Sequence, residues 1–115
     1  MLGAVLAAAA GDAAACLVAI EAHSAVAKVS AEEIEKAFTV PLEQALQPLG
    51  EIQQIRSQTS EGRVRIELRC TASDAAAVAD IVRARLSSVR LGLDLRAGDP
   101  RVWPIERPLL IEQPR

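Results

Sequence analysis

The chain has 115 residues, which is enough for one domain with a single hydrophobic core. Half of its residues are hydrophobic but only 2% are aromatic, so we expect an aliphatic core. The net charge of -2 gives no overall attraction to nucleic acid or to anionic lipid, and any partner has to be recognised by a local surface.

Residues 1–15 are an apolar, alanine-rich N-terminal extension. They lack the basic start of a secretory signal peptide, and Gly3, Gly11 and Asp12 interrupt the apolar run. A membrane span needs about 20 apolar residues, so we expect no span in this chain. We interpret the extension as a tail or a short helix in front of one domain at residues 16–107. Residues 108–115 are expected to form an extended C-terminal tail.

The pattern of apolar residues predicts strands at residues 16–23, 51–59, 63–70 and 101–106. The third is the clearest, because Val64, Ile66, Leu68 and Cys70 alternate with charged residues. The second has only Ile52 and Ile55 as apolar residues, and their spacing of three indicates a bulge or a position at the sheet edge. Pro104 places the last strand at an edge, since proline has no N–H to donate.

Two amphipathic helices are predicted between these strands. Ser30 and Glu33 have the spacing of a capping box, and the first helix should run from there to about Gly50. Pro41 is expected to bend or tighten it near its middle. The second helix should be capped by Thr71, with Asp74 three residues on, or by Ser73. Its buried positions are expected to be Ala75, Val78, Val82, Leu86 and Val89.

The order strand, helix, strand, strand, helix, strand predicts an α+β fold of the ferredoxin-like βαββαβ type. Its antiparallel sheet would have the order 4-1-3-2, with both helices on one face. The first and third strands are then central neighbours, so Cys16 and Cys70 should approach each other. The sequence leaves open whether they form a disulfide or stay reduced as small buried side chains.

The best candidate for a functional surface is the sheet face away from the helices. We expect it to carry Arg63, Arg65, Glu67 and Arg69 from the third strand, beside Glu21 and His23 from the first. It is either a partner surface or a solvated face with cross-strand ion pairs. Nucleic-acid binding is not favoured, because ferredoxin-like RNA-binding domains stack bases on aromatic side chains of this face.

The sequence does not predict an enzyme, a metal site or a cofactor site. His23 has no Cys, Asp or Glu partner at a meaningful spacing, and the two cysteines match no metal motif. The chain also lacks a glycine-rich phosphate loop, a Ser-His-Asp set and the Cys-x-x-Cys of metal chaperones.

Three segments resemble the porter region of resistance-nodulation-division (RND) efflux transporters. They are VSAEEIEK at 29–36, TVPLEQAL at 39–46 and EIQQIRSQTSEG at 51–62, and residues 74–90 and 100–102 continue the match. The similarity covers about residues 15–107 and is closest to the first N-terminal porter subdomain. This family usually approaches the first helix through aromatic-Pro-Gly-Ala-Ser, whereas here the residues are Val26, Ala27, Lys28, Val29 and Ser30.

The resemblance implies the ferredoxin-like fold and a periplasmic position at the inner membrane. It further implies a subdomain that shapes a transport path by packing against like subdomains, and that does not pump alone. The interaction surfaces would be the exposed sheet face and an edge strand with residues 109–113, through which a homo-oligomer could also form. The alternative is a free-standing ferredoxin-like module that binds a ligand or a protein partner, in a location that the sequence does not specify.

Overall fold

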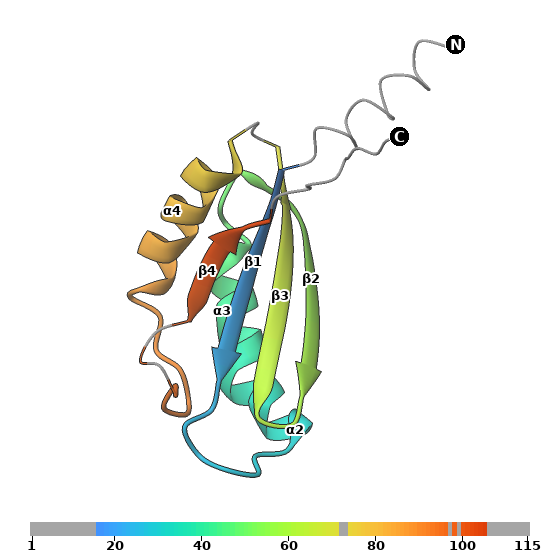
Figure 1. The fold of residues 1–115 in the computed structure, drawn as a ribbon, viewed down its shortest axis with the longest axis vertical. Coiled ribbons are helices and arrows are strands. Elements are labelled where there is room, and N and C mark those ends of the chain that lie inside the picture. Colours follow the sequence, from blue (N-terminus) through green and yellow to red (C-terminus); the bar gives the residue numbers. More distant parts are fainter. Residues whose placement is uncertain (1–15, 72–73, 97, 99, 106–115) are drawn as a thin grey trace, which may run out of the picture.

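Four strands form one antiparallel sheet, and the helices cover one of its faces (Figure 1). The computed structural model describes residues 16–71, 74–96, 98 and 100–105. The strands are β1 (Cys16–His23), β2 (Ile52–Ser60), β3 (Arg63–Cys70) and β4 (Arg101–Pro104), in the spatial order β2-β3-β1-β4. This confirms the predicted ferredoxin-like α+β fold and its strand order. The expected N-terminal extension and C-terminal tail lie outside the described residues.

The two central strands pair without interruption. The register of β1 and β3 runs from Cys16 opposite Cys70 to His23 opposite Arg63. At the edge of the sheet, β2 shifts register between Ile52 and Gln54. This irregularity brings Ile52 and Ile55, three residues apart, onto the helix-facing side, where both pack against the core. The predicted bulge and the two predicted edge positions, those of β2 and β4, are therefore confirmed.

The first helical stretch consists of α2 (Ala31–Ile34), the π-helix η1 (Glu35–Thr39) and α3 (Val40–Leu46). The predicted capping box is present, because the Glu33 N–H donates to the Ser30 hydroxyl and the Ser30 N–H to the Glu33 carboxylate. The helix ends at Leu46, earlier than expected. Gln47 still has helical dihedral angles and its N–H donates to the Glu43 carbonyl, but Pro48 has no N–H with which to continue the helix.

Of the two outcomes expected at Pro41, a bend or a tighter turn, the tighter turn is wrong, because the turn before Pro41 is wider than an α-helical one. Without an N–H, Pro41 cannot donate to the Ala37 carbonyl, and the helix passes this point as a π turn in which the Val40 N–H donates to Glu35. The Ala37 carbonyl accepts instead from the Gly92 N–H, at 3.1 Å. A Cβ at Gly92 would lie 3.2 Å from the Ala37 Cβ, so any larger residue there would have to move the two segments apart by a few tenths of an ångström.

The wider turn also explains the buried stripe of this helix. Ile34, Phe38, Leu42 and Leu46 are fully buried although they recur at intervals of four rather than 3.6 residues. In a regular α-helix such a row would drift around the axis, and the π turn returns it to the sheet.

The second helix, α4 (Ala75–Leu86), begins one position after the start that a Ser73 cap would give and three positions after that of a Thr71 cap. Its N-cap is Asp74, whose Oδ1 accepts from the backbone N–H groups of Ala76 and Ala77. Thr71 is therefore not the cap, and Ser73 lies outside the described residues. The aspartate is favoured here because its charge complements the positive helix end. In the second half of α4, the Arg83 guanidinium donates to the Val102 carbonyl of β4 at 2.8 Å.

The core lies between the sheet and the helices and is aliphatic, as the composition predicted. Phe38 is its one aromatic residue, and the same buried cluster contains side chains of β1, β3, α3 and α4. The buried positions predicted for α4 are confirmed at Val78, Val82 and Leu86, while Ala75 and Val89 are half-buried at its border.

Candidate interaction surface

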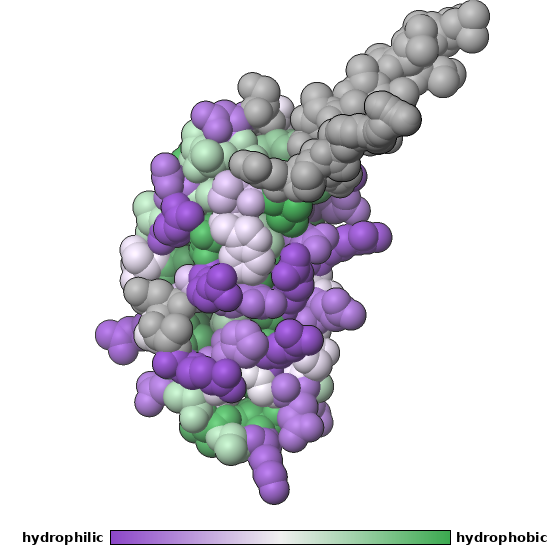
Figure 2. Space-filling model, in the orientation of Figure 1, coloured by the Kyte–Doolittle hydropathy of each residue, from purple (hydrophilic) through white to green (hydrophobic). Residues whose placement is uncertain are grey.

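The second face of the sheet is not covered by helices, and we call it the open sheet face. Figure 2 shows hydrophilic side chains across its middle. Register and alternation place its residues, which are Leu17, Ala19, Glu21 and His23 from β1, Gln54, Arg56, Gln58 and Ser60 from β2, Arg63, Arg65, Glu67 and Arg69 from β3, and Arg101 and Trp103 from β4. All six residues predicted for this surface lie on it.

Glu21 is the centre of the charge network on this face. Its carboxylate lies 3.5 Å from the Arg65 guanidinium, 3.9 Å from those of Arg63 and Arg101, and 3.6 Å from the His23 imidazole. Its side chain is only 14% exposed. Arg65 also reaches Glu67 at 3.4 Å, so it bridges the two carboxylates of the face. One mostly buried carboxylate therefore holds together side chains from three strands.

Trp103 is a member of this surface that the sequence reasoning missed. It stands opposite Ala19, and the guanidinium groups of Arg65 and Arg101 lie 5.4 and 5.1 Å from its ring centroid. Such cation–π contacts hold the arginines over the ring. The signal was present in the sequence: Val102 is apolar between Arg101 and Trp103, and a strand that buries Val102 must turn both neighbours to the other face.

Towards β2 the surface is hollowed. A shallow hollow of about 350 Å³ is lined by Arg56, Ser57, Gln58, Arg65 and Glu67. Within the described residues, Arg56 makes no ion pair although Glu67 stands opposite it in the register. Its guanidinium is exposed and available to a carboxylate from outside the chain.

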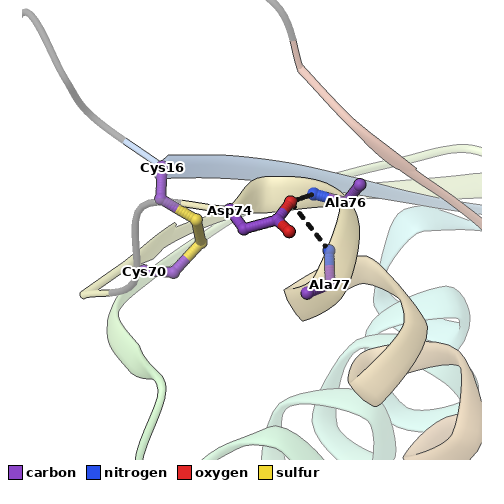
Figure 3. Close-up of a disulfide and its surroundings, with 5 residues drawn as sticks. All are labelled: Cys16, Cys70, Asp74, Ala76 and Ala77. Carbon is purple, nitrogen blue, oxygen red and sulfur yellow. Dashed lines mark hydrogen bonds between the residues drawn. A yellow bond between two sulfur atoms is a disulfide. The ribbon is translucent and has the colours of Figure 1, made fainter.

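Cys16 and Cys70 lie at one end of the sheet, on the helix-facing side, and are joined by a disulfide (Figure 3). Their Cα atoms are 5.0 Å apart, inside the range that a disulfide requires. Both residues are almost fully buried. The bond lies beside the N-cap Asp74 and its two backbone donors, so it fixes the two central strands where α4 begins.

The residues that the structure describes contain no group of three His, Cys, Asp or Glu side chains that could hold a metal ion. In the same part of the chain, none of the helices has the length and apolar character needed to cross a bilayer. What the open sheet face offers chemically is charge, hydrogen bonding and one stacked aromatic ring. These groups can bind a partner surface or an ionic ligand.

The fold and this surface define a class: a ferredoxin-like α+β domain with a charged, aromatic-centred sheet face. The model of the AcrB/AcrD/AcrF family matches residues 14–110, and the chain therefore belongs to this family of RND efflux transporters. The match agrees with the resemblance found in segments 29–36, 39–46 and 51–62. No curated protein matches the sequence.

Proposed function

We propose that this chain is an extramembrane, porter-type subdomain of an RND efflux transporter. In this role it catalyses no reaction and moves no substrate alone, and it helps to shape the path along which small molecules or metal ions are exported. The observation that carries the proposal is the extent of the family match, residues 14–110, which takes in every strand and helix of the domain.

The open sheet face is the surface by which this subdomain would pack against like subdomains of the assembly. Its ion pairs and the Trp103 stack hold the side chains in place before a partner arrives, which lowers the entropic cost of docking. The outer edges of β2 and β4 offer a second contact, because their unpaired backbone groups could extend the sheet into a homo-oligomer. The tail at residues 109–113, also expected to contribute, lies outside the described residues.

The proposed location is the periplasmic face of the inner membrane. The Cys16–Cys70 disulfide supports it, because disulfides persist in oxidising compartments and are rare in the cytosol.

An antibody raised against the domain tests both the assembly and the location. In fractionated source cells we expect a membrane-bound polypeptide much longer than 115 residues. Protease added to spheroplasts should remove the epitope, since the periplasmic side is then accessible. A soluble band of the size of this chain would contradict the proposal and would favour a free-standing binding module.

The role of the open sheet face is tested in the same polypeptide by reversing two arginines, Arg56→Glu with Arg63→Glu. We expect dye accumulation in the cells to rise because efflux falls, at an unchanged amount of transporter in the membrane. The matched control is Arg90→Glu, an exposed arginine beyond the end of α4. Equal efflux in both variants would argue against a role for this face.

A further inference from the structure

A groove lies at the end of the domain where β1 finishes. The loop at residues 24–30, the first helical stretch and the loop at residues 91–95 meet there (Figure 1). The groove between them has a volume of about 520 Å³, which is within the usual range of binding sites, about 300–1,000 Å³. We call it the lysine groove, and the lining residues that matter below are Val26, Lys28, Lys36, Ala37, Gly92 and Leu93.

Backbone hydrogen bonds fix the three walls of the lysine groove to one another. The Ala25 N–H of the first loop donates to the Asp94 carbonyl of the second at 2.9 Å. The second loop is in turn joined to η1 by the bond from the Gly92 N–H to the Ala37 carbonyl. The groove is therefore formed before any partner binds, and little conformational entropy is lost when one does.

The apolar part of the groove faces solvent. Val26 is 51% exposed, more than any other large hydrophobic side chain in the described part of the chain. The buried Ser24 hydroxyl accepts from the Val26 N–H and donates to the Val26 carbonyl, both at 2.9 Å, so Val26 is held in this position. The half-buried Ala37 and Leu93 continue the apolar area, and Figure 2 shows hydrophobic side chains at this end of the molecule. A fixed and exposed apolar area of this kind is typical of a contact site.

Both lysines of the chain line this groove. Within the residues that the structure describes, neither Lys28 nor Lys36 forms an ion pair. The carboxylate at the groove belongs to Glu33, and it accepts from the Ser30 N–H and hydroxyl, at 3.4 Å each, as part of the helix cap. The two ammonium groups are therefore available to carboxylates from outside the domain.

Two irregular features of the backbone lie at the same place. Lys28 has a φ of +58°, a conformation that glycine adopts with less strain. Lys36 and Ala37 belong to the π turn of η1, and π turns are frequent at functional sites. Strain at one residue is often part of how a site works. A lysine in a glycine-type position lowers the stability of the fold, and its presence is explained if its ammonium group binds a partner.

We propose that the lysine groove binds an acidic segment of a separate polypeptide. An apolar side chain of this segment packs on Val26 and Leu93, and carboxylates next to it bind Lys28 and Lys36 through charge-assisted hydrogen bonds. An apolar anchor with complementary charges around it is a common arrangement at protein interfaces. The inference goes beyond the proposed function and does not use the open sheet face.

The shape of the groove favours a protein segment over a small molecule. A small ligand usually buries about 70–90% of its surface in its site. The rim of the lysine groove is exposed at Val26, Lys28 and Gly92, so the groove covers one side of its occupant. One covered side is sufficient for a segment whose conformation is held by the rest of its own protein.

The position of the groove favours a separate polypeptide over chain that continues directly from this domain. The ends of the sheet at Cys16 and Ile105 lie together, because the Ile105 N–H donates to the Leu17 carbonyl. The lysine groove lies beyond the other end of β1, a strand of eight residues that spans roughly 26 Å (Figure 1).

Photo-crosslinking in lysed source cells tests the inference. The photoreactive residue p-benzoylphenylalanine replaces Val26 in the full-length polypeptide, and the matched control carries it at Ile81, which is 37% exposed on α4. We expect light to join the Val26 position to another polypeptide, at a segment with an apolar residue next to two or more aspartates or glutamates. The Ile81 position should not be joined to this partner. High salt should lower the yield, because it screens the charges.

Substitution of the lysines shows whether their charge carries the contact. Lys28→Glu with Lys36→Glu should lower the yield of the crosslinked product about tenfold, because like charges then face each other. Lys28→Arg with Lys36→Arg keeps both charges and should keep most of the yield.

Lys28→Gly separates binding from folding. It removes one ammonium group and relieves the strained turn, so the crosslinked product should fall about threefold in a domain that is no less stable. A merely structural role of Lys28 would leave the yield unchanged or raise it.

Several results would overturn the inference. They are no crosslinked polypeptide at the Val26 position, a link to lipid alone, to a second copy or to another part of the same polypeptide, a partner segment without acidic residues, or an unchanged yield in Lys28→Gly. None of them alters the efflux expected of the Arg56→Glu, Arg63→Glu transporter, so the proposed function is judged separately.

Discussion

Lys28 has a backbone conformation that usually belongs to glycine. Its φ is +58°, in the left-handed region, just before the helix cap at Ser30. It stands at the position of the glycine in the aromatic-Pro-Gly-Ala-Ser of similar sequences, so this chain has a left-handed residue there without a glycine. A left-handed conformation costs an L-residue about 1–2 kcal/mol.

Replacing this lysine by glycine should stabilise the domain. We expect Lys28→Gly to raise the free energy of unfolding by about 0.5–1 kcal/mol, because the relief of strain exceeds the added backbone entropy of the unfolded chain. Urea unfolding measures the change. The control is Lys36→Gly in η1, where the same substitution should lower stability by about 1 kcal/mol. A loss of stability in both variants would show that the turn at Lys28 is not strained.

Glu21 should matter more for stability than other surface carboxylates. Glu21→Gln keeps the shape of the side chain but leaves Arg63, Arg65 and Arg101 facing one another without their shared anion. We expect a loss of about 1–2 kcal/mol, between the values for exposed and buried ion pairs, in urea unfolding at low salt. Glu61→Gln, at an exposed residue of the β2–β3 turn, should change stability by less than about 0.5 kcal/mol. Equal losses of stability in the two variants would mean that the ion-pair network around Glu21 does not stabilise the fold.

At the scale of elements, strands were easier to predict than helix details. The register of β3 follows from strict alternation of Val64, Ile66 and Leu68 with charged residues, and a strand has only two faces to choose from. The π turn was not predicted. The sequence shows that Pro41 cannot donate to the Ala37 carbonyl, but not that the N–H of Gly92, from a distant loop, donates to this carbonyl instead. Patterns in the local sequence cannot show a contact between residues so far apart in the chain.

The part of the candidate surface that lies on β1 and β3 was also predictable, because side chains alternate between the two faces of a strand. Its β1 and β3 members follow from alternation once the strand order is known. Arg101 and Trp103 were not assigned to it, since β4 has only four residues and its apolar signal rests on Val102. The cap of α4 was missed because Thr71, Ser73 and Asp74 are all good capping residues, and the sequence does not show which one has extended geometry.

The disulfide should be the strongest single contribution to the stability of the sheet. It closes a loop of 54 residues between β1 and β3, for which the chain-entropy model gives about 4 kcal/mol. We expect a reducing agent to lower the free energy of unfolding by about 2–4 kcal/mol. The Cys16→Ala, Cys70→Ala variant should not respond to the reducing agent. Two titratable thiols in protein purified under oxidising conditions would contradict the prediction.

At the scale of the whole molecule, the sheet and the helices share one hydrophobic core. The buried cluster contains residues of β1, β3, both helical stretches and, through Val102, the short strand β4. Elements that share one core and one set of packing contacts are expected to unfold together. The weakest connection is that of β4, which pairs only with β1 and is fixed to α4 by the Arg83 guanidinium on the Val102 carbonyl.

Trp103 makes this cooperativity measurable, because it is the sole tryptophan of the chain and lies on β4. We expect its fluorescence and the far-UV circular dichroism of the helices to report the same urea midpoint. Arg83→Ala removes the hydrogen bond between α4 and β4, so in this variant the fluorescence transition should come first. Arg90→Ala, at an exposed residue without such a bond, should keep the two transitions together. Separate transitions already in the unmodified chain would mean that β4 opens on its own, and that the tryptophan centre of the open sheet face is less firmly held than the core beneath it.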